Sequence, residues 1–175
     1  ISFRIKHNLN IIYFIIILKL NNTYKYIFLY SIMNNELVTT KQGANIIYYT
    51  SYFQLFVIIC GSYYGLNDCC IAMALLFMTS TCYWKNPVSN SLLQKIDILC
   101  AISVISYHWL RVGGYTCESK YRTSIFMGCL LYPISWYIHV CKQNQLLAAL
   151  FHCGLHMILN FSAIGIYSCI HQENI

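Results

Sequence analysis

Charged residues are scarce in this sequence. Only 9% of its 175 residues are Asp, Glu, Lys or Arg, whereas soluble domains carry about 25%. Hydrophobic residues make up 58% of the chain, which is more apolar surface than a soluble core of this length can bury. These proportions exclude an ordinary soluble domain and indicate that lipid surrounds most of the chain.

A stripe of basic residues is also missing. The formal net charge is +6, but four of the eleven Lys and Arg residues lie within the first 32 positions. The rest of the chain is only mildly basic and has no Lys and Arg residues interleaved with aromatics that could follow a phosphate backbone. The sequence therefore gives no support to a nucleic-acid partner.

Residues 1–32 lack Gly, Ala, Val, Asp, Glu, Pro, Cys and Trp. Nearly all of their residue types can be encoded by A and T alone, so we interpret this segment as an upstream stretch translated in frame, with Met33 as the start. A signal peptide or a first membrane helix is the alternative, because Ile11–Leu18 follows a basic start. That run is too short to span and is interrupted by Lys19. We expect a single transmembrane domain at 33–175.

Five apolar runs within 33–175 approach the roughly 20 residues that cross a bilayer as a helix. Helix is the expected structure, because lipid offers no partner for backbone polar groups and the runs lack the alternation of a barrel. The sequence thus predicts an all-α, polytopic transmembrane helix bundle of about five helices, with its two ends on opposite sides of the membrane. The runs are Ile46–Tyr64, Cys69–Trp84, Ile96–Leu110, Ser124–Val140 and Leu146–Ile170.

The connecting segments alternate between two sides of the predicted bundle. Side B holds the segment before the first run and the loops after the second and fourth runs, and side A holds the others. Aromatic residues near the run ends, such as Tyr83, Trp84 and Trp109, are expected at the membrane interface. The positive-inside rule favours side B as cytoplasmic, because it carries Lys41, Lys85, Lys95 and Lys142.

The ten cysteines form no C-x-x-C pair and no cluster with metal-ligand spacing. Most lie inside the apolar runs, where a free Cys acts as a small apolar side chain. A disulfide framework is therefore not expected. One bridge stays open, between Cys117 and any of Cys69, Cys70 or Cys169, if side A is lumenal.

Ionisable residues inside membrane spans are costly and often functional. His152 and His156 are four residues apart, so both imidazoles lie on one face of the last helix, at the spacing of helical metal sites. Asp97 is the one acidic residue inside the five predicted runs. His108 and His139 have aromatic neighbours, and we expect them near side A as interface anchors.

Chain order places three motifs near side B. Ser80 lies late in the second run, Asp97 opens the third, and the two histidines lie in the first turns of the last, so the sequence predicts one shared pocket. Each motif also has a structural interpretation. Asp97 could pair with Lys95, Ser80 could help helices pack, and each His could bond a neighbouring helix. Asn160 begins a glycosylation sequon, but inside a membrane run we give it no role.

Together these motifs resemble the CREST superfamily of membrane hydrolases and receptors, which includes alkaline ceramidases, progestin and adipoQ receptors and haemolysin III relatives. The family has Ser-x-x-x-His in an early helix, an Asp at the start of the next and His-x-x-x-His in the last. The resemblance covers roughly 77–167 and implies zinc on His152 and His156, with Asp97 or water completing the sphere. Trp84 occupies the place of the third zinc-binding His, and about seven helices are usual where we count five.

Three functions follow from these observations. The first is a non-catalytic or degenerate CREST-like membrane protein, a scaffold or receptor-like partner. The second is a zinc-dependent amidohydrolase acting on a membrane lipid, with zinc on His152 and His156 activating water and with Asp97 and Ser80 as catalytic residues. The third, a transporter or channel, has less support because broken helices and polar rings are not evident.

Overall fold

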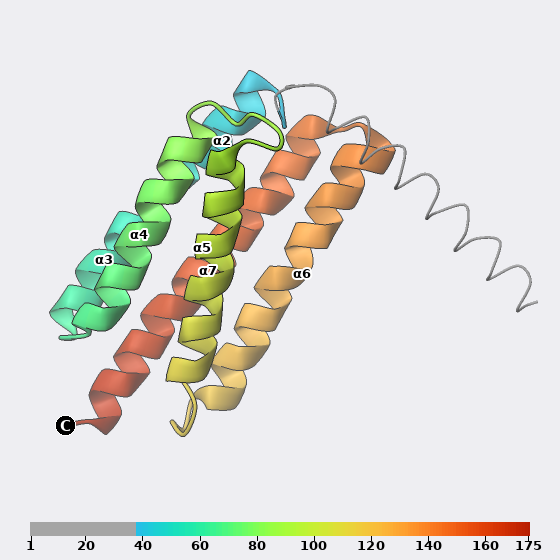
Figure 1. Ribbon diagram of the computed structural model, residues 1–175. Coiled ribbons are helices and arrows are strands. Elements are labelled where there is room, and N and C mark those ends of the chain that lie inside the picture. Colours follow the sequence, from blue (N-terminus) through green and yellow to red (C-terminus); the bar gives the residue numbers. More distant parts are fainter. Residues whose placement is uncertain (1–37) are drawn as a thin grey trace, which may run out of the picture. The chain divides into compact units, whose positions relative to one another are not determined.

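The computed structural model describes residues 38–175, and every regular element among them is a helix. The chain forms α2 (Lys41–Ser51), α3 (Phe53–Tyr63), α4 (Asn67–Trp84), α5 (Leu92–Arg111), α6 (Glu118–Lys142) and α7 (Gln145–Glu173) (Figure 1). Each of the five predicted runs lies within these helices or ends one residue beyond them. The all-α prediction is therefore confirmed.

Helices α2 and α3 together form the first rod, with a local break at Tyr52. The hydroxyls of Thr50 and Ser51 both donate to the Ile47 carbonyl, at 2.8 and 3.0 Å. Hydroxyl groups that bond back to the preceding turn compete with the helical backbone and commonly bend a helix. The amide of Tyr52 accordingly donates to the Tyr49 carbonyl, three residues back, rather than continuing the regular ladder.

Successive rods run in opposite directions (Figure 1). The start of α2, the α4–α5 loop and the α6–α7 junction share one end of the bundle, which is side B of the prediction. The α3–α4 turn, the α5–α6 loop and the end of α7 share the other, side A. The expected extension at 1–32 lies outside the described residues. Within residues 38–175, three helical segments are long and apolar enough to cross a membrane: Lys41–Tyr63, Glu118–Lys142 and Gln145–Glu173.

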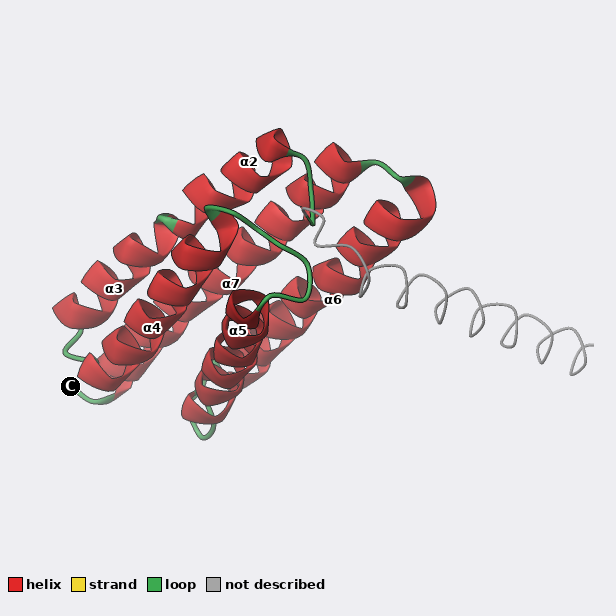
Figure 2. Cartoon of the chain, turned by 45° about the horizontal axis from the view of Figure 1, so that its top comes forward, coloured by secondary structure: helices red, strands yellow, loops and turns green. Residues whose placement is uncertain are grey.

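Helix α7 is the central element. It packs along α6 on one side and against α2 and α3 on the other (Figures 1 and 2). Glycines allow the close approach of α6 and α7, because a Cβ at Gly128 would lie 3.0 Å from Leu159, and a Cβ at Gly165 would overlap the Tyr121 ring. The fully buried side chains of Ile166 and Tyr167 form part of the core that results.

Helix α5 is the least enclosed of the five rods. It packs chiefly against α4 and meets α6 and α7 over short stretches only. Ser91 caps its start by accepting a hydrogen bond of 3.1 Å from the Gln94 amide, which fixes where the helix begins after the reversal at Pro87. The limited packing of α5 against α6 leaves the space in which the candidate site lies.

Side A is tied together by covalent and polar links. A disulfide joins Cys117 in the α5–α6 loop to Cys169 near the end of α7, which is one of the three pairings that the sequence left open. Asp68 lies at the start of α4, just before the apolar run. Its carboxylate accepts a hydrogen bond from the Tyr107 hydroxyl, and Arg111 Nε lies 3.4 Å from it. The hydrogen bond from Tyr107 is the main cause that lowers the pKa of Asp68.

Candidate functional site

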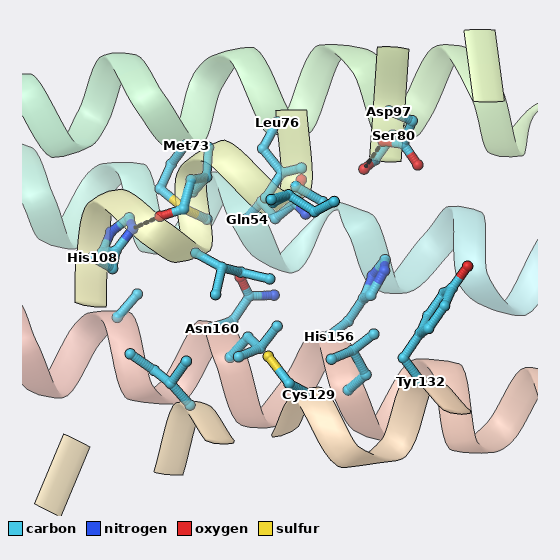
Figure 3. A pocket seen from close by; sticks show the side chains of 18 of the residues that line it. Gln54, Met73, Leu76, Ser80, Asp97, His108, Cys129, Tyr132, His156 and Asn160 are labelled. Atoms are coloured by element: carbon cyan, nitrogen blue, oxygen red, sulfur yellow. Dashed lines mark hydrogen bonds between the residues drawn. The ribbon is translucent and has the colours of Figure 1, made fainter. Parts of the chain in front are cut away.

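A cavity of about 320 Å³ lies among α3, α4, α5, α6 and α7. Ser80, Asp97, His152 and His156 all line it, so the structure brings together the four residues that the sequence predicted to share a pocket. Figure 3 shows Ser80 and Asp97 side by side at one end of the cavity, with His156 across from them. The roles assigned to these residues stay predictions.

Asp97 is held by hydroxyl groups of α4. Its Oδ1 accepts a hydrogen bond of 2.6 Å from Ser80 and one of 3.3 Å from Thr79. Both Ser80 and Asp97 are buried, whereas Lys95 is exposed on another face of α5. The ion pairs of residues 38–175 are Arg111–Asp68 and Arg122–Glu118, so Asp97 is not the partner of Lys95.

The two histidines lie against each other on α7. Their ring centroids are 4.9 Å apart, and the rings of Trp84 and Tyr132 lie 5.0 and 6.1 Å from His152. His156 Nδ1 and Trp84 Nε1 are buried and have no hydrogen-bond partner in the described part of the chain. Because buried polar atoms are nearly always paired in folded proteins, these two atoms are free to bond to a water or a ligand.

The donor set of the site differs from that of a catalytic zinc centre. A catalytic zinc ion takes three protein ligands, and an indole N–H can only donate a hydrogen bond, so Trp84 supplies none. Among residues 38–175, the group of three His, Cys, Asp or Glu ligand atoms within 4.8 Å of one another is Cys117, Cys169 and Glu173, whose sulfurs are already bonded together. Asp97 does not complete such a group with His152 and His156. Two imidazoles alone do not fit the resembled centre.

Two amides that the sequence reasoning missed also line the cavity. Asn160 is 4% exposed and lies four residues beyond His156, so it continues the same face of α7; the i, i+4, i+8 spacing was the available signal. Gln54 of α3 is 3% exposed, and its Oε1 has no hydrogen-bond partner in the described residues. The one side-chain amide inside the run Ile46–Tyr64 was the signal for Gln54.

Two histidine predictions were wrong. His108 is no interface anchor: it is buried, it lines the cavity, and its ring nitrogens lie 2.7 Å from the Tyr167 hydroxyl and 2.8 Å from the Val104 carbonyl. His139 lies at side B instead of side A, because α6 runs from side A to side B and His139 is in its last turn.

Two aromatic predictions were also wrong. Tyr83 and Trp84 are buried, at 2% and 6% exposure, and do not lie at an interface with the surroundings. Both pack into a small cluster with Ile47, Ala149 and Cys153, because α4 turns its last residues toward α2 and α7. The Trp84 ring therefore lies against His152, one of the residues that line the cavity.

A smaller cavity of about 110 Å³ continues from the site toward side B. It shares Asp97, Tyr132 and His152 with the main cavity and is also lined by Thr39 and His139. The Thr39 hydroxyl is buried and has no partner in the described residues. The polar cluster, which consists of Ser80, Asp97, His152 and His156, thus lies between two cavities. The smaller one extends toward side B, and the larger, mainly apolar one extends toward side A.

The main cavity is open to the side of the bundle. Ile98 and Ile102 of α5 line it and are nonetheless 40% and 57% exposed, so the lining continues onto the outer surface. This opening lies along α5, the helix that is least enclosed by its neighbours. Within residues 38–175, Asp97 is the one Asp, Glu, Lys or Arg that lines the cavity.

Comparison with protein-family models, with curated proteins and with solved structures found no match to this chain. The CREST resemblance therefore depends on the motifs at Ser80, Asp97, His152 and His156 alone.

Proposed function

We propose that this chain is a non-catalytic, multi-pass membrane protein, a degenerate CREST-like relative that binds a membrane lipid between its helices. The observation that carries the proposal is the cavity of about 320 Å³, apolar along most of its length, polar at the Asp97 end and open along α5. A volume of this size lies within the range of small-molecule sites.

The exterior of the bundle supports a lipid environment. Beyond the three candidate spans, α4 and α5 carry large apolar side chains on their outer faces, including Ile71 at 64% and Leu99 at 66% exposure. Exposed apolar side chains of this size are unfavourable in water and favourable against acyl chains. Side chains such as these would let α4 and α5 cross beside the longer helices.

The lining of the cavity supports an amphiphile as the ligand. Ser80, Asp97 and His156 offer hydrogen-bonding atoms at one end, while apolar side chains such as Leu76 and Ile105 line most of the remainder. Because the one carboxylate faces no Lys or Arg in the lining, an anionic head such as a phosphate would be repelled. A neutral or cationic head that hydrogen-bonds to the polar end fits better.

Trp84 supports a binding role without catalysis. It lies against His152 at the position where the resembled family has its third zinc ligand, and it fills that space with an aromatic ring. The ring removes a metal ligand and adds an apolar wall. A lipid head could still bond to His156 Nδ1, a buried atom that has no partner in the described residues and whose side chain lines the cavity.

Binding of tritiated hexadecanol to the detergent-purified protein tests the proposal. Ala101 lines the cavity on α5, whereas Ser103, two residues away, is exposed on the same helix and does not. We expect Ala101→Phe to fill the cavity and weaken binding at least about tenfold, and Ser103→Phe, the matched control, to leave binding unchanged. Absence of saturable binding to the native protein, or equal binding by both variants, would overturn the proposal.

A lipid amidohydrolase is the second candidate, because the 2.6 Å Ser80–Asp97 hydrogen bond and the unpartnered His156 Nδ1 line one cavity. Such an enzyme would need a further zinc ligand beside His152 and His156, because two imidazoles alone do not fit a zinc centre. Zinc content of the purified protein separates the candidates. The binding role predicts no zinc in the native protein and a gain toward one ion per chain in Trp84→His. Native zinc that is lost in His156→Ala would favour the hydrolase instead.

A further inference from the structure

The amides of Gln54 and Asn160 occupy a part of the cavity that the polar cluster does not explain. They come from α3 and α7, are 3% and 4% exposed, and lie between the Asp97 end and His108 (Figure 3). Neither belongs to the motifs of the resembled family. A head-group site at Asp97 does not explain why two amides lie in this mainly apolar part of the cavity.

The spacing along α7 separates these amides from the polar end. Asn160 follows His156 by one helical turn and His152 by two, which corresponds to about 6 and 12 Å along the axis. The three side chains share one face of the helix and line the same cavity. A ligand whose head lies at Asp97 would therefore pass Asn160 with the middle of its chain.

The Gln54 amide oxygen has an unmet need for a donor. It is buried and has no partner in the described residues, and leaving such an atom unpaired is costly. Neighbouring donors are already used: the ring nitrogens of His108 are 2.7 and 2.8 Å from Tyr167 and the Val104 carbonyl. The Ser80 hydroxyl donates to Asp97. The Gln54 amide oxygen therefore has no hydrogen-bond donor among the described residues, and a ligand hydroxyl can supply one.

The chemistry of that donor is narrowed by charge. No Asp, Glu, Lys or Arg other than Asp97 lines the cavity in residues 38–175, and Asp97 is bonded by Ser80 at the opposite end. A charged group beside Gln54 would lose its hydration without gaining an opposite charge. A hydroxyl group avoids that cost, since it donates to one amide oxygen and accepts from an amide N–H.

We propose that Gln54 and Asn160 form a second, uncharged subsite that binds a hydroxyl group on the interior part of the ligand chain. The inference rests on the proposed lipid-binding function and names a feature of the lipid: an amphiphile with one polar group at its head and a hydroxyl further along its chain. The two amides thereby select hydroxylated chains over plain ones.

The test compares two tritiated probes, hexadecanol and a hexadecanediol whose second hydroxyl is at mid-chain. We expect the native protein to bind the diol about five- to tenfold more tightly, the effect of one added hydrogen bond to a buried group. In Gln54→Leu the preference should be lost, because the second hydroxyl then keeps only Asn160 as a hydrogen-bond partner. Gln42→Leu, which removes an exposed amide of α2, is the matched control.

Each outcome decides the inference. Equal or weaker binding of the diol by the native protein overturns the subsite but leaves the proposed function standing, and absence of hexadecanol binding overturns both. A diol preference that persists in both Gln54→Leu and Asn160→Leu also overturns it. Size-exclusion chromatography and thermal unfolding in detergent report whether a variant is folded, and if Gln54→Leu fails this check, Asn160→Leu decides.

Discussion

The Ser80 hydroxyl donates a hydrogen bond of 2.6 Å to the Asp97 carboxylate and so links the last turns of α4 to the first turns of α5. Both side chains are buried. An acid in apolar surroundings is stable only when hydrogen bonds replace its lost water, and Ser80 and Thr79 supply them. This link turns Asp97 toward the cavity and leaves Lys95 on the outside.

Removal of the Ser80 hydroxyl should destabilise the bundle. Ser80→Ala leaves the buried Asp97 carboxylate without its shortest hydrogen bond, and we expect a loss of about 1.5–3 kcal/mol in the free energy of unfolding. The measurement is thermal or denaturant unfolding of the protein in detergent. Ser103→Ala is the control, because its hydroxyl is exposed and bonds only to the Leu99 carbonyl of its own helix.

The same pair should show coupling. In the double variant Ser80→Ala with Asp97→Asn, the cost should be less than the sum of the single costs, because the neutral amide no longer needs the hydroxyl so strongly. Strict additivity would show that the two side chains do not act together.

Gly165 should tolerate a methyl group only when Tyr121 is truncated. A Cβ at Gly165 would overlap the Tyr121 ring, so Gly165→Ala should cost about 1–3 kcal/mol. In a Tyr121→Ala background the same change should be neutral or stabilising, because Ala favours helix over Gly by about 1 kcal/mol. Gly154→Ala is the comparison: its Cβ would lie 3.1 Å from a Leu131 methyl, which can move. Equal costs in both backgrounds would contradict the close α6–α7 contact.

Reduction should loosen side A. The Cys117–Cys169 bridge joins residues 52 apart, and in the chain-entropy model a loop of that length contributes up to about 4 kcal/mol. We expect a reductant to lower the melting temperature of the native protein and to leave Cys117→Ser and Cys169→Ser unaffected. Cys82→Ser, which changes a free and exposed cysteine, should keep the native response. Alkylation of Cys117 without prior reduction would disprove the bridge.

Inserted reporters can show whether the shorter helices cross the membrane. A tag in the α4–α5 loop at Asn86 and one in the α6–α7 junction at Gln143 should be accessible from the same side, and a tag at Gly113 from the other. The lysines in the side B loops and the disulfide on side A both indicate that side A is the oxidising, non-cytoplasmic side. If the tags at Asn86 and Gly113 were protected on the same side, α5 would not cross.

The helices and their order followed from sequence alone, since the apolar runs and the polar joints such as Gly65–Asp68 depend only on local residue types. Chain order and alternating direction also sufficed to place Ser80, Asp97 and the two histidines near one end. The direction of α6 was available from the same reasoning, and it was misapplied to His139.

Rotation of each helix about its axis needed the tertiary structure. Hydrophobic periodicity specifies little where both lipid and core are apolar, so the sequence did not reveal that Trp84 and His108 face inward or that Gln54 and Asn160 share a cavity. The choice of Cys169 over Cys69 or Cys70 as the partner of Cys117 was decided in the same way. Contacts between residues far apart in the chain determine these features, because packing of glycines against rings and of hydroxyls against Asp97 sets how the rods meet.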